Sequence, residues 1–494
     1  MKRERFSKFF FQQGLIAVII IYFAFHGYVV HFGSVPQGSL MLLSLALLAI
    51  GIITQRFFYR IFRNEGKATL YTAILLLIVL FFGVFQDIIS GLKPIANFGR
   101  LTLFFPFSLL IIIACFFAIK RSASTFSRFR IFLTTLVIIY ILVDLFALFR
   151  LTGSGEIKQG KNNNVVIKAP FAMPRPSVYL LLLDEYLGNE GLYSYYHYPN
   201  SKFKQKLLDQ RFHIISNPSS NYNLTIYSMA SMLNMEYLRN AVPAVISNHY
   251  AYKQALQAID KNKISAMFRQ MGYRVINKSP FYFDGHVPAY SSGLLPDKIN
   301  LAQHQTMYYR VAKALPEIMA EKFGFRYFAE RNTELADESN NLMMNEVLRE
   351  TAMMDDGPSL TYLHLMMPHE PLVRDSLGNK LGLTNYGSSR DAAKVDAAYL
   401  QYLVYSNNKV GQFIDSLKSN TSNKAIILLM SDHGSRHLAR KVPSYAYNNL
   451  LAIYLPSGNY EAWYPALTNV NVFPILFNTV FGVRVPLLKD SIVR

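Results

Sequence analysis

Cysteine is almost absent from the chain. Cys115 is the one cysteine among 494 residues, and it lies within a long apolar run. The rest of the chain therefore has no disulfide, no cysteine metal site and no cysteine nucleophile. A metal bound there would need oxygen or nitrogen ligands from Asp, Glu, His or Thr, which suit hard or borderline cations.

Acidic side chains are also scarce, since 31 acidic residues face 50 basic ones and leave a formal net charge of +19. Residues 1–150 hold 15 basic and four acidic side chains, a balance of +11. We attribute this excess to membrane topology and expect no nucleic-acid partner. The remaining +8 suits a domain beside anionic lipid headgroups, and an ordinary basic surface explains it equally well. The chain shows neither an internal repeat nor a low-complexity tract.

Long apolar runs separated by short basic loops fill the first 150 residues. Most of these runs reach the roughly 17–20 residues that a helix needs to cross a bilayer. A cleaved signal peptide is the alternative for the first run, but it lacks a small-residue cleavage site and four further runs follow. We predict five membrane helices: Gly14–Phe32, Leu40–Thr54, Ala68–Phe85, Leu101–Ile119 and Ile131–Phe149.

Basic residues in the flanking loops predict the orientation of these helices. Twelve lysines and arginines lie before the first run, after the second and between the fourth and fifth, against three on the alternate side. The positive-inside rule then places the N-terminus in the cytoplasm and everything after the fifth helix outside. We expect a transmembrane domain over residues 1–150, a linker over 151–176 and an extracytoplasmic catalytic domain over 177–494. Gly153–Asn164 is the most polar and turn-rich part of that linker.

Short apolar runs alternate with amphipathic stretches after the linker. Ser177–Tyr186, Ser359–Pro371 and Asn423–Gly434 contain continuous apolar runs of strand length, which suits strands buried on both faces. Residues 397–419 have apolar side chains at helical spacing. This alternation predicts an α/β sandwich with a mainly parallel sheet.

Ionisable residues follow all three predicted strands. The pairs are Asp184–Glu185, His369–Glu370 and Asp432–His433. Ligands bind beyond the carboxyl ends of strands in such sheets. One polar strand end is ordinary surface, but three that supply carboxylates and imidazoles favour a metal site. The mixture of oxygen and nitrogen ligands suits Zn²⁺, and Mn²⁺ or Mg²⁺ are the other candidates.

A nucleophile is offered by the segment Ser220–Asn234. Turn-forming residues lead into an apolar stripe with helical spacing, so Thr225 lies at or near the start of a helix. Unpaired backbone N–H groups and the helix dipole favour a phosphate at such a position. An ordinary N-cap threonine explains the same pattern.

Four short motifs, in their order along the chain, resemble those of the alkaline phosphatase/sulfatase superfamily, and the C-terminal segment resembles its closing helix. The closer resemblance is to membrane-anchored phosphotransferases, namely phosphoethanolamine transferases and lipoteichoic acid synthase-like enzymes, which pair five membrane helices with an extracytoplasmic sulfatase-like domain. The motifs that carry it are "LLLDEY" (Leu181–Tyr186), "TIYSMASM" (Thr225–Met232), "PHEP" (Pro368–Pro371), "SDHG" (Ser431–Gly434) and the closing "NVNVFPILFNTVFGV" (Asn469–Val483).

The chain also departs from these families. The sulfatase pattern C/S-x-P-x-R is absent from the outer domain, which disfavours a sulfate-ester hydrolase. The Gly–Glu of phosphoethanolamine transferases is replaced by Asp184–Glu185, and their "DHGES" reads "DHGSR". Their several disulfides have no counterpart.

Residue roles follow from the resemblance. It implies that Asp184, Asp432 and His433 bind the metal, with Glu185 as a further candidate ligand. Thr225 would be both a ligand and the nucleophile, because metal coordination would generate its alkoxide. Ser228, one turn further on, is the nearest rival.

Two histidines would handle the substrate. The resemblance implies that His369 binds the phosphoryl oxygens or protonates the leaving alkoxide. His437 would join the substrate site if the chain turns after Gly434, and a surface histidine is the alternative.

The expected function is therefore metal-dependent transfer of a phosphoethanolamine-type headgroup from a membrane phospholipid to an envelope glycan or lipid, through a phosphothreonine. The expected location is a bacterial inner or plasma membrane, with the catalytic domain periplasmic. A phosphodiesterase or other hydrolase could use the same site with water as acceptor. A non-catalytic membrane protein that keeps the fold is a third hypothesis, which the retention of Thr225, Asp184, Asp432 and His433 argues against.

Overall fold

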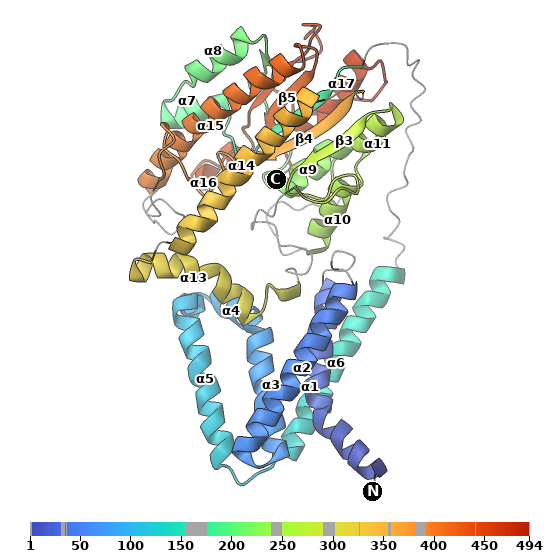
Figure 1. Cartoon of the computed structure of the whole chain (residues 1–494), viewed down its shortest axis with the longest axis vertical. Helices are drawn as coiled ribbons and strands as arrows, with labels where there is room; N and C mark the ends of the chain where they lie inside the picture. Colours follow the sequence, from blue (N-terminus) through green and yellow to red (C-terminus); the bar gives the residue numbers. More distant parts are fainter. Residues whose placement is uncertain are drawn as a thin grey trace. The chain divides into compact units, whose positions relative to one another are not determined.

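The computed structural model describes residues 2–30, 35, 37–153, 175–238, 249–289, 302–325, 327–353, 357–381, 392–439 and 441–493. The chain forms two compact units (Figure 1). Unit 1 is Met1–Asn163 with Pro296–Phe325, and unit 2 is Asn164–Leu295 with Arg326–Arg494. Within the predicted linker, residues 154–174 lie outside the described residues.

Unit 1 is helical throughout its described part. Its helices are α1 (Lys2–Val30), α2 (Gln37–Phe62), α3 (Glu65–Leu80), α4 (Phe82–Gly91), η1 (Lys93–Gly99), α5 (Leu101–Arg121), α6 (Ser127–Gly153) and α13 (Met307–Phe323). Helix α1 packs against α2, α3 and α6. The buried core between them is mainly aliphatic, with Ile16, Ile19 and Leu76 among its residues.

Three helices of unit 1 are long and apolar enough to cross a membrane: Gly38–Phe62, Leu101–Arg121 and Ser127–Phe149. Helices α3 and α4 make a fourth if this pair, bent by 59°, counts as one span. The apolar part of α1, Gly14–Val30, is shorter. The chain is thus a membrane protein, and the count of five passes stays a prediction.

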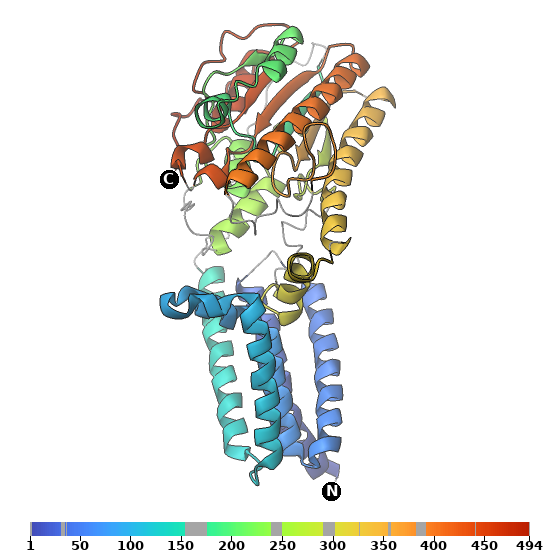
Figure 2. The ribbon, with the colours of Figure 1, turned by 90° about the vertical axis from the view of Figure 1, so that its left-hand side faces the viewer.

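The third predicted helix, Ala68–Phe85, is not continuous. It is interrupted at Phe81, and α4 leaves α3 at a sharp angle (Figure 2). The backbone N–H of Gly83 donates to the carbonyl of Gln305 at 2.7 Å instead of continuing the ladder of α3. A carbonyl inserted into the ladder is an established cause of helix kinks. A Cβ at residue 83 would displace the ends of the Gln305 and Arg310 side chains, which lie against this glycine.

The sheet of unit 2 confirms the predicted α/β class. Its strands are β1 (Val178–Leu183), β2 (His213–Ile214), β3 (Arg274–Lys278), β4 (Ser359–Leu365), β5 (Ile426–Ser431) and β6 (Leu451–Tyr454). They lie in the order β2-β6-β5-β1-β4-β3. Strands β5, β1, β4 and β3 are parallel to their neighbours in this group, while β6 runs antiparallel to both β5 and β2. The sheet is therefore mixed but mainly parallel.

Helices cover both faces of this sheet. Helices α9 (Thr225–Asn234), α11 (Lys263–Gln270) and α17 (Val472–Val480) contribute to the core on one face. The core on the other face includes residues of α8 (Ser201–Asp209), α14 (Tyr327–Met353) and α15 (Ala392–Asn420), which Figure 1 shows together. The remaining helical segments of unit 2 are α7 (Asn189–Tyr196), α10 (His249–Asp260), α16 (Arg436–Ala439), η3 (Pro443–Ala446) and η4 (Asn469–Asn471).

The central strand β1 is continuously apolar because it is buried on both faces of the sheet. Leu180 and Leu182 belong to one core, and Leu181 and Leu183 to the other. All six residues of β1 are buried. A strand covered on both faces has no polar alternation, as the sequence predicted.

Candidate metal centre and active site

Three parallel strands end together at the site. Leu183 is paired with Leu365 of β4 and with Ser431 of β5, so the last residues of the three strands are in register. Asp184 and Asp432 are the next residues along β1 and β5 and therefore emerge side by side at one edge of the sheet.

Asp184, Asp432 and His433 form a buried group suited to a metal ion. One ligand atom from each residue lies within 4.8 Å of those of the other two. Exposures of 3%, 0% and 0% leave these side chains almost no contact with solvent. Two carboxylates this close without solvent repel each other unless a cation lies between them.

The hydrogen bonds of this group leave its metal-binding atoms open. Oδ1 of Asp184 and Oδ2 of Asp432 are buried and accept no hydrogen bond, although Asp432 Oδ2 lies 3.2 Å from His433 Nε2. His433 Nδ1 lies 2.7 Å from the carbonyl of Gly434, so it donates there and leaves the Nε2 lone pair unprotonated. Two orphaned carboxylate oxygens and one imidazole nitrogen fit a divalent cation such as Zn²⁺.

Thr225 lies beside the same group of side chains and belongs to helix α9. It is the first residue of α9, and its Oγ1 lies 3.3 Å from His433 Nε2. The N-cap of α9 is Leu224, which makes no side-chain capping bond. The Thr225 hydroxyl is thus not a capping group, and it lies beside the nitrogen that is a candidate metal ligand.

The rival serines of α9 are engaged elsewhere. Ser228 Oγ donates to the carbonyl of Asp432 at 2.6 Å, and Ser231 Oγ donates to the carbonyl of Glu236 at 2.7 Å. Both residues are buried. Ser228 therefore holds the backbone of a candidate ligand, whereas Thr225 keeps its hydroxyl at the group itself.

Gly434 is required by close backbone packing after His433. Its N–H donates to the carbonyl of Ala446 at 3.0 Å. A Cβ at this position would overlap the carbonyl oxygens of Tyr445 and Asn448, neither of which can move as a side chain could. The glycine of the "DHG" motif thus lets the chain turn tightly behind the candidate ligands.

Glu185 and His369 lie together beside the metal-binding group. The backbone N–H of Glu185 donates to Asp432 Oδ1 at 3.1 Å, but its carboxylate turns toward the backbone N–H of Arg436, 2.6 Å from Oε1. Glu185 Oε2 lies 3.5 Å from His369 Nε2. Glu185 adopts a left-handed backbone conformation, with φ 60°, which separates its side chain from that of Asp184. Its predicted role as a metal ligand stays a prediction that this arrangement does not favour.

Arg436 lies with Glu185 and His369, and it has no sequence signal of function beyond its place directly after "DHGS". Its Nη2 donates to His369 Nε2 at 2.8 Å and lies 3.8 Å from Glu185 Oε2. His369 Nδ1 makes a short hydrogen bond to the carbonyl of Glu370. Because a guanidinium only donates, the imidazole in this arrangement carries its proton on Nδ1.

His437 points away from the metal-binding group. Its Nε2 lies 3.1 Å from Oδ1 of Asp396 on α15. The hydroxyl of Tyr195 and the ammonium of Lys441 donate to Oδ2 of the same carboxylate, at 2.9 Å and 3.2 Å. The substrate-binding role of His437 remains a prediction. The hydrogen bonds around Asp396 give this histidine a structural role.

His364 is a site residue that the sequence did not indicate. It lies within β4, has no exposed surface, and its Nε2 is 3.3 Å from Oδ2 of Asp184. A histidine inside an apolar strand gives no sequence signal of function, because its partner becomes visible only when β4 pairs with β1.

The electrostatics of the site favour an ionised Asp184. Burial alone raises the pKa of its carboxyl, but the imidazoles of His369, His364 and His433 outweigh burial and hold the pKa well below its usual range. Burial conversely lowers the pKa of His369, and the carboxylates of Asp184 and Glu185 outweigh it, so that the pKa is raised. The site therefore keeps a carboxylate ready to bind a cation.

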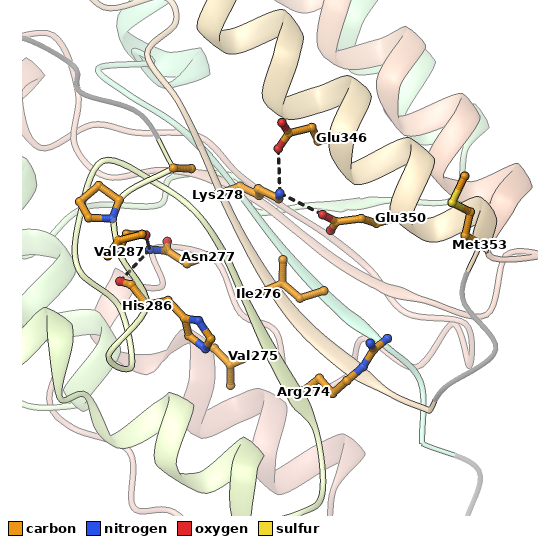
Figure 3. A pocket seen from close by; sticks show the side chains of 12 residues that line it. Arg274, Val275, Ile276, Asn277, Lys278, His286, Val287, Glu346, Glu350 and Met353 are labelled. Carbon is orange, nitrogen blue, oxygen red and sulfur yellow. Dashed lines mark hydrogen bonds and ion pairs between the residues drawn. The ribbon is translucent and has the colours of Figure 1, made fainter.

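A separate groove of about 710 Å³ lies at the edge strand β3, away from these residues. Lys278 projects there between Glu346 and Glu350 of α14, and forms ion pairs with both at 2.8 Å and 2.9 Å (Figure 3). None of the candidate catalytic residues lines this groove. The chemistry of the site thus lies outside it.

Comparisons with known proteins give one family match and several distant structural similarities. A family model described as Sulfatase matches residues 177–477. No curated protein sequence matches the chain. Solved structures share little sequence with it. The C-terminal periplasmic domain of EcEptC from Escherichia coli has 11% identity and a TM-score of 0.40, over 66% of this chain and 90% of that one.

Two further solved structures are similar at the same level. The integral membrane lipooligosaccharide phosphoethanolamine transferase A (EptA) of Neisseria meningitidis has 13% identity and a TM-score of 0.40, over 97% of this chain and 96% of that one. The phosphonate monoester hydrolase of Agrobacterium radiobacter has 12% identity and a TM-score of 0.39, over 62% of this chain and 73% of that one. The Sulfatase match spans more than half of the chain and includes Asp184, Thr225, Asp432 and His433. The chain therefore belongs to the sulfatase family of enzymes.

Proposed function

We propose that this enzyme transfers a phospholipid headgroup of the phosphoethanolamine type to an envelope glycan or lipid, through a covalent phosphothreonine at Thr225. The observation that carries the proposal is the position of the Thr225 hydroxyl, 3.3 Å from His433 Nε2 at the first turn of α9. A hydroxyl beside a buried cation-binding group is a candidate for activation as a nucleophile.

Asp184, Asp432, His433 and Thr225 are the residues that would hold a divalent cation, with Zn²⁺ the first candidate. A bound cation would stabilise the alkoxide of Thr225 and the negative charge on the phosphoryl oxygens. The orphaned oxygens of Asp184 and Asp432 support this assignment.

The proposed reaction has two balanced displacements at phosphorus. The Thr225 hydroxyl first gives up its proton and Oγ1 forms a bond to the donor phosphorus, while the bond to the diacylglycerol oxygen breaks and diacylglycerol leaves as an alcohol after taking up a proton. An acceptor hydroxyl then bonds to the same phosphorus, loses its proton, and the bond from phosphorus to Thr225 breaks. His369, which follows β4, is the candidate for the proton given to the leaving group; its raised pKa favours the doubly protonated imidazole, in which Nε2 donates and no longer accepts from Arg436.

The membrane unit fits a lipid donor. Its apolar helices hold the chain in a bilayer, so donor and enzyme meet by diffusion in two dimensions. The asymmetry of the basic loops supports a catalytic unit on the outer side of a bacterial inner or plasma membrane.

The proposal is tested with the full chain in detergent, loaded with zinc and given phosphatidylethanolamine labelled in its headgroup, without an acceptor. We expect diacylglycerol release and a phosphoethanolamine adduct on the peptide that contains Thr225, in the wild type and in Ser228→Ala. An adduct on another residue would refute the assigned nucleophile. In a second incubation with a glycan or lipid acceptor added, release of free phosphoethanolamine without transfer to that acceptor would instead identify a hydrolase.

A further inference from the structure

Arg436 holds an unusual position beside the metal-binding group. It follows "DHGS" directly, and its backbone N–H is fixed by Glu185 Oε1 at 2.6 Å. Its guanidinium touches His369 Nε2 at 2.8 Å, while the nearest carboxylate oxygen in an ion pair lies 3.8 Å away. The side chain is 39% exposed, so part of the guanidinium stays accessible to a ligand.

A comparison with Arg374 shows what a structural arginine of the same unit looks like. Arg374 donates from Nε and Nη2 to one oxygen of the buried Asp337, at 3.0 Å and 2.7 Å, and a third nitrogen reaches the carbonyl of Gly378. Its side chain is 21% exposed. Arg436 makes no such double contact with a carboxylate, although Glu185 lies next to it.

The neighbouring carboxylate of Glu185 accepts a backbone hydrogen bond rather than one from the guanidinium. Glu185 Oε1 accepts the backbone N–H of Arg436, and Oε2 lies nearer to His369 than to the guanidinium, at 3.5 Å against 3.8 Å. The guanidinium thus forms only a long ion pair with Glu185, and its hydrogen bond goes to His369 instead. The position of Arg436 brings a guanidinium and an imidazole, from the ends of β5 and β4, to within one hydrogen bond of each other.

We propose that Arg436 binds the non-bridging oxygens of a tetrahedral phosphoryl anion at this site. The inference rests on the proposed phosphoryl chemistry and adds the residue that recognises the anion. A guanidinium has five N–H donors in a planar fork that matches two oxygens of a phosphate. Arg436 uses one of these in its hydrogen bond to His369, which leaves donors for a ligand.

The same contact stabilises charge during transfer. In the transition state of transfer, the phosphoryl group carries its negative charge on its three equatorial oxygens. A guanidinium held beside these oxygens stabilises that charge. The ligand chemistry is shared by a lipid phosphodiester and by free inorganic phosphate. The two sources differ in whether Arg436 also affects turnover of the lipid.

The test uses the zinc-loaded full chain and three variants: Arg436→Gln, Arg436→Lys and the control Arg269→Gln. Arg269 pairs with Asp284 on the surface and its side chain is 54% exposed, so its loss removes a guanidinium without touching the site. Calorimetric titration with inorganic phosphate should show binding at least about 10-fold weaker in Arg436→Gln, with Arg436→Lys intermediate and the control unchanged. Zinc content should stay at the wild-type level in all three.

Turnover distinguishes the two sources of the anion. With labelled phosphatidylethanolamine, Arg436→Gln should lose about 100-fold in kcat/KM if the lipid phosphodiester is the ligand. A fourth variant, Arg436→Ala, should regain part of its activity in millimolar guanidinium ion, which a purely structural arginine would not allow. Weaker phosphate binding with normal lipid turnover would assign the contact to free phosphate.

Two results would overturn the inference: phosphate affinity of Arg436→Gln within twofold of the wild type, or loss of zinc from that variant. A different result is expected if the proposed function itself is wrong. In that case the wild type forms no adduct from phosphatidylethanolamine, while the phosphate titration still reports on Arg436.

Discussion

The imidazole of His364 lies between Asp184 and Tyr362, with Nε2 3.3 Å from the Asp184 carboxylate and Nδ1 2.8 Å from the Tyr362 hydroxyl. All three side chains are buried. One carboxylate oxygen of Asp184 is thus held from within the sheet, while the other has no hydrogen bond. Carboxylate ligands are commonly oriented in this way by a neighbouring hydrogen bond.

Replacing His364 should therefore weaken metal binding while the candidate ligands stay in place. We expect His364→Gln to reduce zinc affinity by about 10–100-fold, the usual effect of removing such an outer contact. Competition with a chromophoric chelator measures this affinity. Tyr362→Phe, which removes only a hydroxyl, should have a smaller effect in the same direction. Unchanged affinity in both variants would show that Asp184 needs no support from β4.

The metal-binding group itself predicts a sharper loss. Asp432→Asn and His433→Ala should each lower the bound zinc per chain, measured by elemental analysis, because each removes one of three buried ligands. Asp396→Asn is the matched control, since Asp396 is also a carboxylate paired with a histidine but lies outside the group. Full zinc occupancy in either ligand variant would contradict the assignment.

Much of this site could be predicted because each part has a local signal. β1 and most of β5 are apolar without alternation since helices cover both faces of the sheet. Parallel strands in register end at one edge, so Asp184 and Asp432 had to meet if the runs were strands. The turn and apolar stripe around Thr225 located the start of α9 in the same way.

What could not be predicted depends on contacts between distant segments. His364 acquires a partner only through strand pairing, and the direction of the Glu185 side chain follows from its left-handed backbone. The break between α3 and α4 is similar. It depends on Gln305, more than 200 residues later in the chain, in a segment that the contacts group with unit 1. In the same segment, Arg310 donates two hydrogen bonds to the carboxylate of Asp87 in α4, from Nη1 to Oδ1 at 3.0 Å and from Nη2 to Oδ2 at 2.7 Å.

The C-terminal tail should respond to acid through Asp490. Partial burial raises the pKa of its carboxyl, but hydrogen bonds from Tyr464, Thr468 and Asn471 outweigh burial and hold the pKa below its usual value. A carboxyl with a lowered pKa adds stability above its unfolded pKa of about 3.9, and this stability is lost as the pH falls toward the folded value.

Asp490→Asn should accordingly lower the stability of unit 2 by about 1 kcal/mol at pH 7, since a partly exposed carboxylate loses only part of its hydrogen-bond energy. The difference from the wild type should shrink below about pH 4, where the wild-type carboxyl also becomes protonated. Thermal unfolding of the full chain at several pH values measures both effects. A difference that is constant with pH would exclude titration of Asp490 as the cause.

Topology can be tested independently of chemistry. The distribution of basic residues predicts that a reporter enzyme active only outside the cytoplasm works when fused after Arg494. The matched control is fusion after Arg63, between α2 and α3, which should be inactive because that loop is predicted to be cytoplasmic. The reverse pattern of activity would invert the membrane unit and place the site in the cytoplasm.

Thr225 gives the most specific prediction, because nucleophile and ligand can be separated at one residue. Thr225→Ala should abolish headgroup transfer yet retain zinc, since Asp184, Asp432 and His433 remain. Thr225→Ser should keep part of the activity, because the hydroxyl survives and only the methyl group that restricts its rotamer is lost. Zinc content and turnover of labelled phosphatidylethanolamine are measured on the same preparations.

Ser228→Ala, which loses a hydrogen bond to the Asp432 carbonyl but no hydroxyl at the candidate metal site, serves as the control. Near-normal turnover in Thr225→Ala would eliminate covalent transfer through this residue while leaving the metal site intact.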